Sequence, residues 1–404
     1  MLISKNIPLK ILRIIASMDP KFGGPSQGIR NITPALLDLG VETEVLSFDP
    51  PTSKYLGKDS FKIYPIGPRK GPYQYCSKLS SWLENNIFNY DILIIHGLWL
   101  HNSFGTYRVW NRMKYLNRDC PKLFVMPHGM LDPYFQKAEG RQFKALRNKL
   151  FYKLIERKVV NGVDGILFTC EQELLLARKA FKPYRPNAEL NVGYGIEEPP
   201  VFKPEFREAF LKKCPDVKNK SFLLFLSRIH PKKGVNLLIN AISELKANNQ
   251  DLPALVIAGP GLETDYGKAI IKLANESGCE IYFPGMLQGS EKWGALYGCD
   301  AFILPSHQEN FGIAVVEALA CKKPVLITNK VNIWREIEKD QSGFVFADEL
   351  SGVISGIKNF NLLSPLTLED MQSQALQTFH SRYTNKEAAE VLKRTLMSNR
   401  IPSQ

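Results

Sequence analysis

The sequence predicts an α/β protein built from two doubly wound, Rossmann-like domains. Short apolar runs recur along the chain, and a helical pattern follows most of them. Strands that alternate with helices are typical of parallel sheets covered by helices. A Pro-rich stretch at residues 199–204 interrupts the alternation, which then begins again. We therefore place residues 1–198 in a first domain and residues 199–386 in a second.

The composition is that of a soluble globular protein, with 44% hydrophobic residues in a chain of 404. This length allows two separate cores. No apolar run approaches the roughly 18 residues that a membrane span needs, and the N-terminus lacks a signal-peptide core, so we expect a cytoplasmic protein. The seven cysteines are scattered without a Cys-x-x-Cys pair, which predicts neither a disulfide framework nor a zinc site.

The formal net charge of +12 indicates a negatively charged partner. Nucleic acid, an anionic membrane surface and a negatively charged small substrate all satisfy this charge. Because the sequence has no zinc-finger, RRM or KH signature, we do not expect nucleic acid.

The first domain is predicted to begin with a strand at residues 10–17 and a helix at residues 27–39. Gly23 and Gly24 lie in the loop between them. Paired glycines at such a turn let backbone N–H groups approach a ligand, although a plain tight turn also explains them. The G-x-G-x-x-G dinucleotide fingerprint is missing here, which disfavours a dehydrogenase.

Two histidines follow apolar runs that are predicted to be buried parallel strands. His96 ends the run at residues 91–96, and His128 follows the run at residues 122–127. Open α/β sheets bind ligands at the carboxyl ends of their strands. A single histidine there is commonly a hydrogen-bonded structural residue, but two at equivalent positions favour a functional site.

A basic amphipathic helix is predicted at residues 141–159. Its apolar face carries Phe143, Leu146, Leu150, Phe151, Leu154 and Ile155, and its other faces carry Lys144, Arg147, Lys149, Lys153 and Arg157. Such a helix either packs its apolar face into the core or lies on an anionic membrane. We predict that its basic face and the net charge of +12 assist peripheral contact with anionic lipid, and the core-packing alternative stays open.

In the second domain, a short strand at residues 301–305 leads through a loop into a helix whose predicted N-cap is Asn310. The free N–H groups of the first helical turn favour a phosphate, and Gly312 lets a ligand approach the backbone. Glu309 lies in the loop just before these groups. This geometry predicts an anion site.

Glu317 follows on the same helix and shares a stripe with Ile313, Val316 and Ala320. Because this spacing points one face of the helix inward, the Glu317 carboxylate needs a partner. Two interpretations remain open. Glu309 and Glu317 bind a ligand, or Glu309 is a solvated loop residue and Glu317 is paired with a core Arg or Lys.

Arg228 and Lys233 lie in a strand-to-helix loop that Gly234 closes. Two cations beside a helix N-terminus are costly together unless an anion lies between them, and a diphosphate satisfies this requirement. A basic loop by itself is common, but its combination with the Glu309 to Glu317 stretch is much more specific.

With these motifs in order, the sequence resembles the retaining glycosyltransferases of family 4, the glycosyl transferases group 1, which have the GT-B fold. The resemblance runs from Gly23 to Glu317 and includes the loops at residues 127–131 and 227–234. In that family two Rossmann-like domains face each other across a cleft. The resemblance implies that the C-terminal domain holds a nucleotide sugar and the N-terminal domain the acceptor. It also implies that the final helix, within residues 387–404, crosses back to the first domain.

The resemblance assigns catalytic roles to four residues. Arg228 and Lys233 are expected to bind the donor diphosphate and stabilise the departing nucleotide. Glu309 is expected to hold hydroxyls of the donor sugar, and His128 to touch the sugar near its reacting carbon. The remaining donor-binding residues implied are Gly23, Gly24, Asn310, Phe311, Gly312 and Ile313 at the phosphates, Glu317 at the ribose, and Gly259, Gly261, Gly285, Met286 and Leu287 at the nucleobase. His96 is a further candidate for the cleft.

The sequence therefore predicts a metal-independent, retaining hexosyltransferase that uses a UDP- or GDP-sugar and a glycan or lipid-linked acceptor, with a role in polysaccharide or glycolipid synthesis. No Asp-x-Asp motif occurs, so we expect neither a divalent metal nor another cofactor. Fixed cations and helix dipoles can stabilise the leaving diphosphate instead. The alternatives are a GT-B sugar-nucleotide epimerase or hydrolase, and a noncatalytic binding protein with the same fold.

Overall fold

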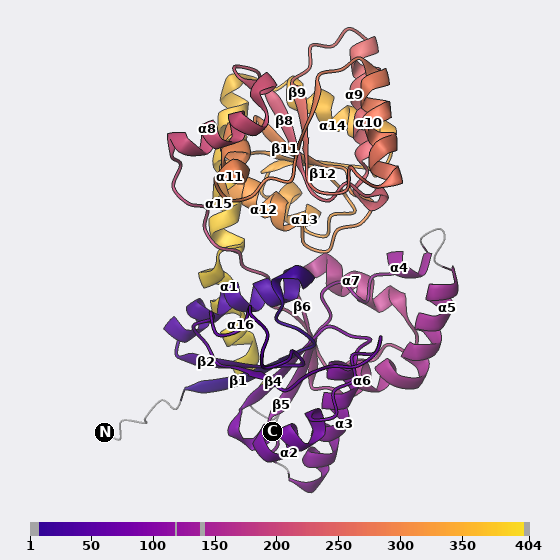
Figure 1. The fold of residues 1–404 in the computed structure, drawn as a ribbon, viewed down its shortest axis with the longest axis vertical. Helices are drawn as coiled ribbons and strands as arrows, with labels where there is room; N and C mark the ends of the chain where they lie inside the picture. The colour runs from indigo at the N-terminus through magenta and orange to yellow at the C-terminus, as the bar shows by residue number, and fades with distance from the viewer. Residues whose placement is uncertain (1–7, 118, 138–141, 400–404) are drawn as a thin grey trace. The chain divides into compact units, whose positions relative to one another are not determined.

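The computed structural model describes residues 8–117, 119–137 and 142–399 (Figure 1). The chain divides into two compact units, one made of Met1–Gly195 with Asn385–Gln404 and one made of Ile196–Thr384. The predicted boundaries at 198/199 and 386/387 lie within three residues of these divisions. Among the residues described, no helix is both long and apolar enough to cross a bilayer.

The first unit contains a parallel sheet in the order β3-β2-β1-β4-β5-β6-β7. The strands are β1 (Leu9–Ile15), β2 (Val41–Ser47), β3 (Ile63–Pro65), β4 (Ile92–His96), β5 (Lys122–Met126), β6 (Gly165–Phe168) and β7 (Glu189–Asn191). The helices are α1 (Gly24–Asp38), α2 (Leu79–Asn86), α3 (His101–Leu116), α4 (Tyr134–Lys137), α5 (Gln142–Phe151), the π-helical η3 (Tyr152–Glu156), α6 (Arg157–Gly162), α7 (Glu171–Ala180) and α16 (Asn385–Ser398).

Both faces of this sheet are buried, because successive strand residues point to opposite sides. Ile92 and Ile94 pack on the face covered by α1 and α16, where Leu392 joins the same cluster. Leu93 and Ile95 pack on the opposite face, under α2, α3 and α6. The continuous apolar runs of the sequence follow from this double burial.

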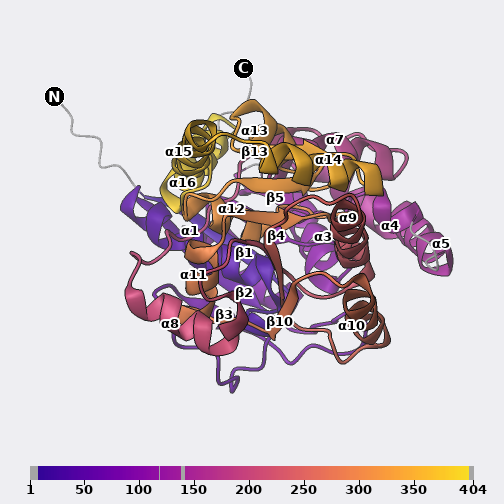
Figure 2. The ribbon, with the colours of Figure 1, turned by 90° about the horizontal axis from the view of Figure 1, so that it is seen from above.

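The second unit contains a parallel sheet in the order β10-β9-β8-β11-β12-β13. The strands are β8 (Phe222–Leu226), β9 (Ala254–Ala258), β10 (Ile281–Gly285), β11 (Ala301–Leu304), β12 (Val325–Thr328) and β13 (Gly343–Phe346). Around it lie α8 (Pro204–Lys213), the 3-10 helix η5 (Pro231–Lys233), α9 (Val235–Ala247), α10 (Asp265–Ser277), α11 (Gly289–Gly298), α12 (Ile313–Ala320), α13 (Trp334–Lys339), α14 (Leu350–Asn361) and α15 (Pro365–Arg382). Helices α9 and α10 stand on one side of the sheet, and α8 and α11 on the other (Figures 1 and 2).

The predicted fold class of two doubly wound, Rossmann-like units is confirmed. In each unit the strand order reverses once, between β1 and β4 in the first and between β8 and β11 in the second. The crevice at the carboxyl ends of such a strand pair is the place where doubly wound sheets bind ligands. These two switch points locate the candidate site residues of each unit.

Two local predictions are wrong. Helix α12 begins at Ile313 after the N-cap Gly312, not after Asn310, because Gly312 adopts a left-handed backbone with φ of 81° that breaks the helical path. The predicted basic helix is α5, η3 and α6 in succession, and residue 141 lies outside the residues described. Its apolar side chains do not form one face, because Phe151 packs inward against Tyr73 whereas Leu150 is exposed.

Candidate active site

In the second unit, the loop that follows β8 is held against the glycine turn that follows β9. The Ser227 N–H donates to the Ala258 carbonyl at 3.1 Å. Gly259 has a φ of 144°, and a Cβ there would collide with the Ser227 carbonyl oxygen. A glycine is therefore required at this contact, which keeps the basic loop at the switch point.

The two predicted cations of this loop have different surroundings. Arg228 is exposed and forms no hydrogen bond or ion pair within residues 8–117, 119–137 and 142–399. Lys233 is only 6% exposed, and its Nζ contacts Glu309 Oε2 in an ion pair. Lys233 and Glu309 are thus in direct contact, whereas Arg228 is available for an external anion.

Glu309 is positioned by its backbone as well as by Lys233. Its N–H donates to the Lys330 carbonyl at 2.9 Å, and its carbonyl accepts from the Asn332 N–H at 2.9 Å. Its second carboxylate oxygen accepts the Asn310 N–H at 3.2 Å. The carboxylate is therefore ordered at the carboxyl edge of β11, and the interpretation of Glu309 as a merely solvated loop residue is wrong.

The start of α12 lies beside this carboxylate. Its N-cap, Gly312, offers no side-chain cap to the first turn. The Asn310 side chain accepts from Asn332 at 3.4 Å, and Phe311 packs edge-on against Tyr383. Uncapped N–H groups at a helix N-terminus and an adjacent exposed arginine make a suitable surface for a phosphate.

Glu317 does have a basic partner. Lys292 of α11 places its Nζ 2.8 Å from Glu317 Oε1, and both side chains are partly buried. Of the two interpretations of Glu317, the one that pairs it with a core Arg or Lys agrees with this contact. The predicted inward stripe is right for Val316 and Ala320 but wrong for Ile313, which is 36% exposed.

The glycines proposed near the nucleobase meet at the ends of β9 and β10. The Gly259 N–H donates to the Gly285 carbonyl at 2.9 Å. A Cβ at Gly261 would lie 2.5 Å from the Ile229 carbonyl oxygen. Met286 is exposed and Leu287 is buried, so only the first of these two side chains is free to contact a ligand.

In the first unit, Gly23 and Gly24 begin α1 at the carboxyl edge of β1. Gly23 has a φ of 78° and serves as the N-cap, which places the helix start three residues before the predicted one. A Cβ on either glycine would meet no atom within 4 Å. The space beside both glycines is therefore open, although the Gly23 N–H already donates to the Pro20 carbonyl at 3.1 Å. The positive φ at Gly23 explains the first glycine.

His96 and His128 contact each other, and a third residue joins them. His96 Nδ1 lies 2.9 Å from His128 Nε2, with the rings stacked at 5.2 Å. The Nη1 of Arg13, in the middle of β1, lies 3.2 Å from His96 Nε2. Because a guanidinium can only donate, His96 accepts at Nε2, carries its proton on Nδ1 and donates to His128. His128 then carries its proton on Nδ1.

Electrostatics keep both histidines neutral. Burial, followed by the charges of Arg13 and His128, lowers the pKa of His96 well below its ordinary value. Burial and then the charge of Arg13 lower the pKa of His128 to about 3. Burial also lowers the pKa of Arg13 to about 10, so the guanidinium remains charged at neutral pH. Arg13 Nε and Nη2 are buried and have no hydrogen-bond partner among the residues described.

The depressed histidine pKa values predict a pH dependence of stability. Below about pH 6.5 the unfolded chain binds protons that folded His128 does not, so stability falls as pH falls toward 3. Burial raises the pKa of Glu156 to about 7, so Glu156 changes stability with pH in the opposite direction. The test therefore compares wild type with a His128 variant, because the contribution of Glu156 is the same in both. In urea unfolding, His128→Asn is expected to lose stability less steeply than wild type between pH 6 and 4, by about 1.4 kcal/mol per pH unit. Asparagine tolerates the φ of 52° at this position. Equal slopes would contradict a neutral His128.

Glu173 is a buried carboxylate that sequence reasoning missed. It accepts the Gly129 N–H at 2.5 Å and the Thr169 N–H at 2.8 Å, and it is therefore bonded to the loops after both β5 and β6. This contact anchors the turn that holds His128.

Arg13 and Lys292 were missed for different reasons. Arg13 had a signal, because a charged residue inside an apolar strand must find a polar environment. Lys292 had no signal in the sequence, because its pairing with Glu317 joins two separate helices.

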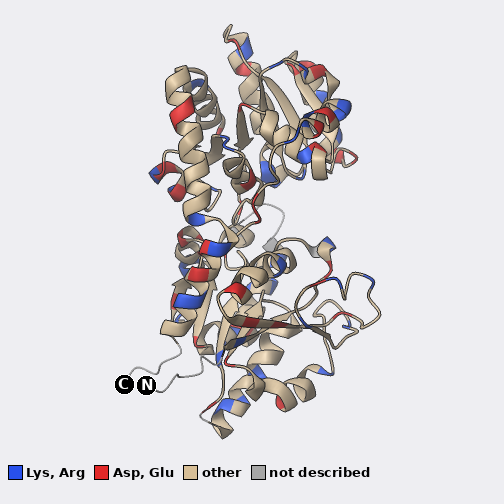
Figure 3. Ribbon diagram, turned by 90° about the vertical axis from the view of Figure 1, so that its left-hand side faces the viewer, with Lys and Arg blue, Asp and Glu red and all other residues tan. Residues whose placement is uncertain are grey.

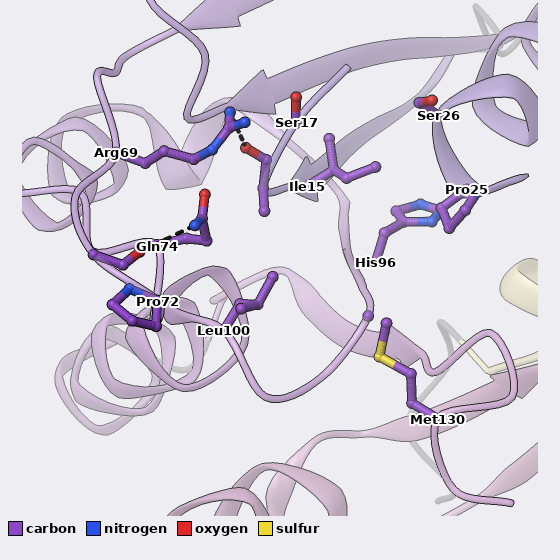
Figure 4. A pocket seen from close by; sticks show the side chains of 13 residues that line it. Ile15, Ser17, Pro25, Ser26, Arg69, Pro72, Gln74, His96, Leu100 and Met130 are labelled. Atoms are coloured by element: carbon purple, nitrogen blue, oxygen red, sulfur yellow. Dashed lines mark hydrogen bonds between the residues drawn. The ribbon is translucent and has the colours of Figure 1, made fainter. Parts of the chain in front are cut away.

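A cavity of about 550 Å³ opens at the switch point of the first unit (Figure 4). Arg69 and Gln74 lie on one side of it, and His96 and Pro25 on the other. Arg69 is held by Asp49 at 2.7 Å. The cavity combines apolar walls with a few fixed polar groups, which is the usual character of a small-molecule site.

Two parallel-sheet units with polar residues at both switch points are the architecture that GT-B glycosyltransferases have. A family model described as Glycosyl transferase 4-like domain matches residues 23–191, and one described as Glycosyl transferases group 1 matches residues 206–359. The chain therefore belongs to the group 1, family 4 type of glycosyltransferases. The predicted resemblance is confirmed.

Two solved structures show the same fold over nearly the whole chain. A glycosyltransferase from Rickettsia africae is 19% identical with a TM-score of 0.72, covering 98% of this chain and 100% of that one. Anabaena HepE in complex with UDP and glucose is 18% identical with a TM-score of 0.69, covering 96% and 100%.

Sequence relatives match over shorter stretches. A lipopolysaccharide 1,2-N-acetylglucosaminetransferase of Salmonella typhimurium is 28% identical over 32% of this chain and 35% of that protein. A D-inositol 3-phosphate glycosyltransferase of Gordonia bronchialis is 25% identical over 54% and 49%. The chain thus spans about a third to a half of the length of these relatives.

Proposed function

We propose that this protein is a cytoplasmic, retaining glycosyltransferase that moves a hexose from a UDP- or GDP-sugar to a glycan or lipid-linked acceptor. The observation that carries the proposal is the arrangement at the β8/β11 switch point. There Arg228, which has no partner in the described part of the chain, follows β8, and an ordered Lys233–Glu309 pair and an uncapped helix start lie beside it at the end of the neighbouring strand β11. The family membership and the UDP-bound HepE structure support a nucleotide-sugar donor.

The charges of this arrangement suit the chemistry. When a sugar–phosphate bond breaks, its electron pair goes to the leaving diphosphate, and the anomeric carbon becomes electron-deficient. Arg228, Lys233 and the start of α12 would stabilise the diphosphate. Glu309 would accept hydrogen bonds from sugar hydroxyls, and His128 would donate from Nδ1 near the reacting carbon. We assign no protein nucleophile, and the acceptor attacks from the face that the nucleotide leaves.

The other donor contacts follow from the same proposal. Glu317 would exchange its bond to Lys292 for the ribose hydroxyls, and the turn at Gly259 and Gly285 would receive the base. Glu309 should therefore govern sugar choice and rate, and Glu317 should govern nucleotide affinity. We propose no divalent metal, because the sequence has no Asp-x-Asp motif and the loop supplies two cations.

A donor panel tests the proposal directly. UDP- and GDP-hexoses are screened first by thermal shift and then by transfer to candidate acceptors, with excess chelator in a parallel series. We expect one donor to raise the melting temperature and to give a product that keeps the donor's anomeric configuration, at a rate the chelator does not change. A product formed without acceptor would indicate an epimerase or hydrolase. Failure of every nucleotide sugar to shift the melting temperature would favour a noncatalytic protein.

A further inference from the structure

The segment from α5 to η3 has two apolar sides, and only one of them is buried. Ala145, Tyr152 and Glu156 face the interior of the first unit, where Tyr152 stacks on Phe181. Burial raises the pKa of Glu156 to about 7, and its carboxyl group accepts from the Ser103 hydroxyl at 2.7 Å. The buried side therefore already anchors the segment to its unit.

The opposite side is an exposed apolar stripe. Phe143 is 91% exposed, Leu146 68%, and Leu150 and Leu154 are each 58% exposed. Their spacing of three, four and four residues places them along one line of a helix. Figure 1 shows α5 at the margin of the first unit. Single exposed apolar residues are ordinary, but these four in line form a continuous stripe.

Basic side chains border this stripe. With 3.6 residues per turn of α5, Lys144 and Arg147 fall on one flank of the stripe and Lys149 falls on the other. Lys153 follows one turn after Lys149, in η3. All four are exposed, and none forms an ion pair within the described part of the chain. We call the stripe and these four cations the α5 surface.

Acidic residues are missing from the exposed side of this segment, because its one acidic residue, Glu156, is buried. Residues 142–155 contain no Asp or Glu at all. Elsewhere in the same unit both signs mix, as on α16, where Lys386 and Lys393 alternate with Glu390, and Figure 3 shows such mixing. The α5 surface is thus locally cationic and apolar together.

We propose that the α5 surface docks on an anionic lipid bilayer, with its apolar stripe at the boundary between headgroups and acyl chains. A helix with an apolar stripe, cationic flanks and no acidic residue matches both layers of such a membrane. A second copy of the chain fits less well, because four cations would then face four others. The inference goes beyond the chemistry proposed above, since binding to lipid requires no sugar donor.

Vesicle sedimentation of the full-length protein tests the docking. Vesicles of phosphatidylcholine alone are compared with vesicles rich in phosphatidylglycerol, at low and high salt. We expect binding to the anionic vesicles only, weakened at high salt because ions screen the lysines. The double variant Leu150→Ser/Leu154→Ser should lower the partition coefficient by about 100-fold, and Lys149→Gln/Lys153→Gln by about 10-fold or more.

Matched controls come from the same unit. Leu116→Ser removes another exposed leucine, and Lys179→Gln another exposed lysine, and neither should change binding. A tryptophan at position 150, introduced as Leu150→Trp, should shift its fluorescence to the blue with anionic vesicles.

Three results would overturn the proposal. The first is wild-type protein that binds no vesicle at low salt. The second is a serine double variant that binds as well as wild type, since attraction would then be electrostatic only. The third is a concentration-dependent dimer in sedimentation velocity that the serine variant abolishes, since the α5 surface would then be an interface between copies.

Discussion

Replacing Arg228 with alanine is expected to reduce the rate of sugar transfer by about 10²- to 10³-fold. Arg228 is exposed at the end of β8 and has no partner among the residues described, so its guanidinium is free for the diphosphate. Negative charge grows on the diphosphate as the sugar–phosphate bond breaks. The loss of activity in the variant should therefore appear mainly in kcat. Initial rates at saturating donor measure the effect on kcat, and calorimetric titration with the nucleotide measures the effect on nucleotide binding.

The control for this prediction is Lys212→Ala, which removes an exposed cation from α8 without touching the basic loop. Arg228→Lys keeps the charge but loses the bidentate fork, and it should retain an intermediate rate. If Arg228→Ala transferred sugar at the wild-type rate with a working donor, Arg228 would not belong to the active site.

Replacing Arg13 with methionine is expected to lower transfer by roughly 10²-fold, although Arg13 is proposed to touch no substrate. Arg13 acts as a positioning residue, because its bond to His96 makes His96 a donor to His128 Nε2 and so puts the His128 proton on Nδ1, which faces no partner among the residues described. Methionine fills similar space but cannot donate, so both rings can take either tautomer.

Two measurements separate this role from a merely structural one. Long-range ¹H–¹⁵N spectra of the histidine rings should show a single tautomer each in wild type and mixtures in Arg13→Met. The charge of Arg13 also lowers the pKa of both histidines, so its removal should raise these pKa values and make the variant lose activity on acidification before wild type does. Arg13→Lys, which keeps a charged donor, should recover part of the rate. Unchanged tautomers together with unchanged activity would refute the positioning role.

Much of the fold was predictable because its signals are local. Each buried parallel strand is a short apolar run, and the residues that follow it lie at the carboxyl edge whatever the strand order is. His96, His128, Arg228 and Glu309 could therefore be assigned to strand ends from the sequence. The first residue of α12 was harder to predict, because the left-handed backbone of Gly312, and not the side chain of Asn310, decides where the helix starts.

The basic helix shows where periodicity alone misleads. Phe151 and Leu150 are neighbours in sequence and both apolar, yet Phe151 packs against Tyr73 while Leu150 faces outward. An amphipathic pattern counts apolar residues on a helix, but only the packing of the surrounding unit shows which of them are covered.

For the Glu309 to Glu317 stretch, the sequence by itself determined the elements: a buried strand, a glycine-containing loop with a carboxylate, and a helix start. Tertiary structure alone decided the partners, which are Lys233 for Glu309 and Lys292 for Glu317. The same holds for Arg13 and His96, which are 83 residues apart and meet because β1 and β4 are neighbours in the sheet. Strand and loop signals arise from a few consecutive residues, whereas these pairings depend on strand order and helix packing, which no local pattern encodes.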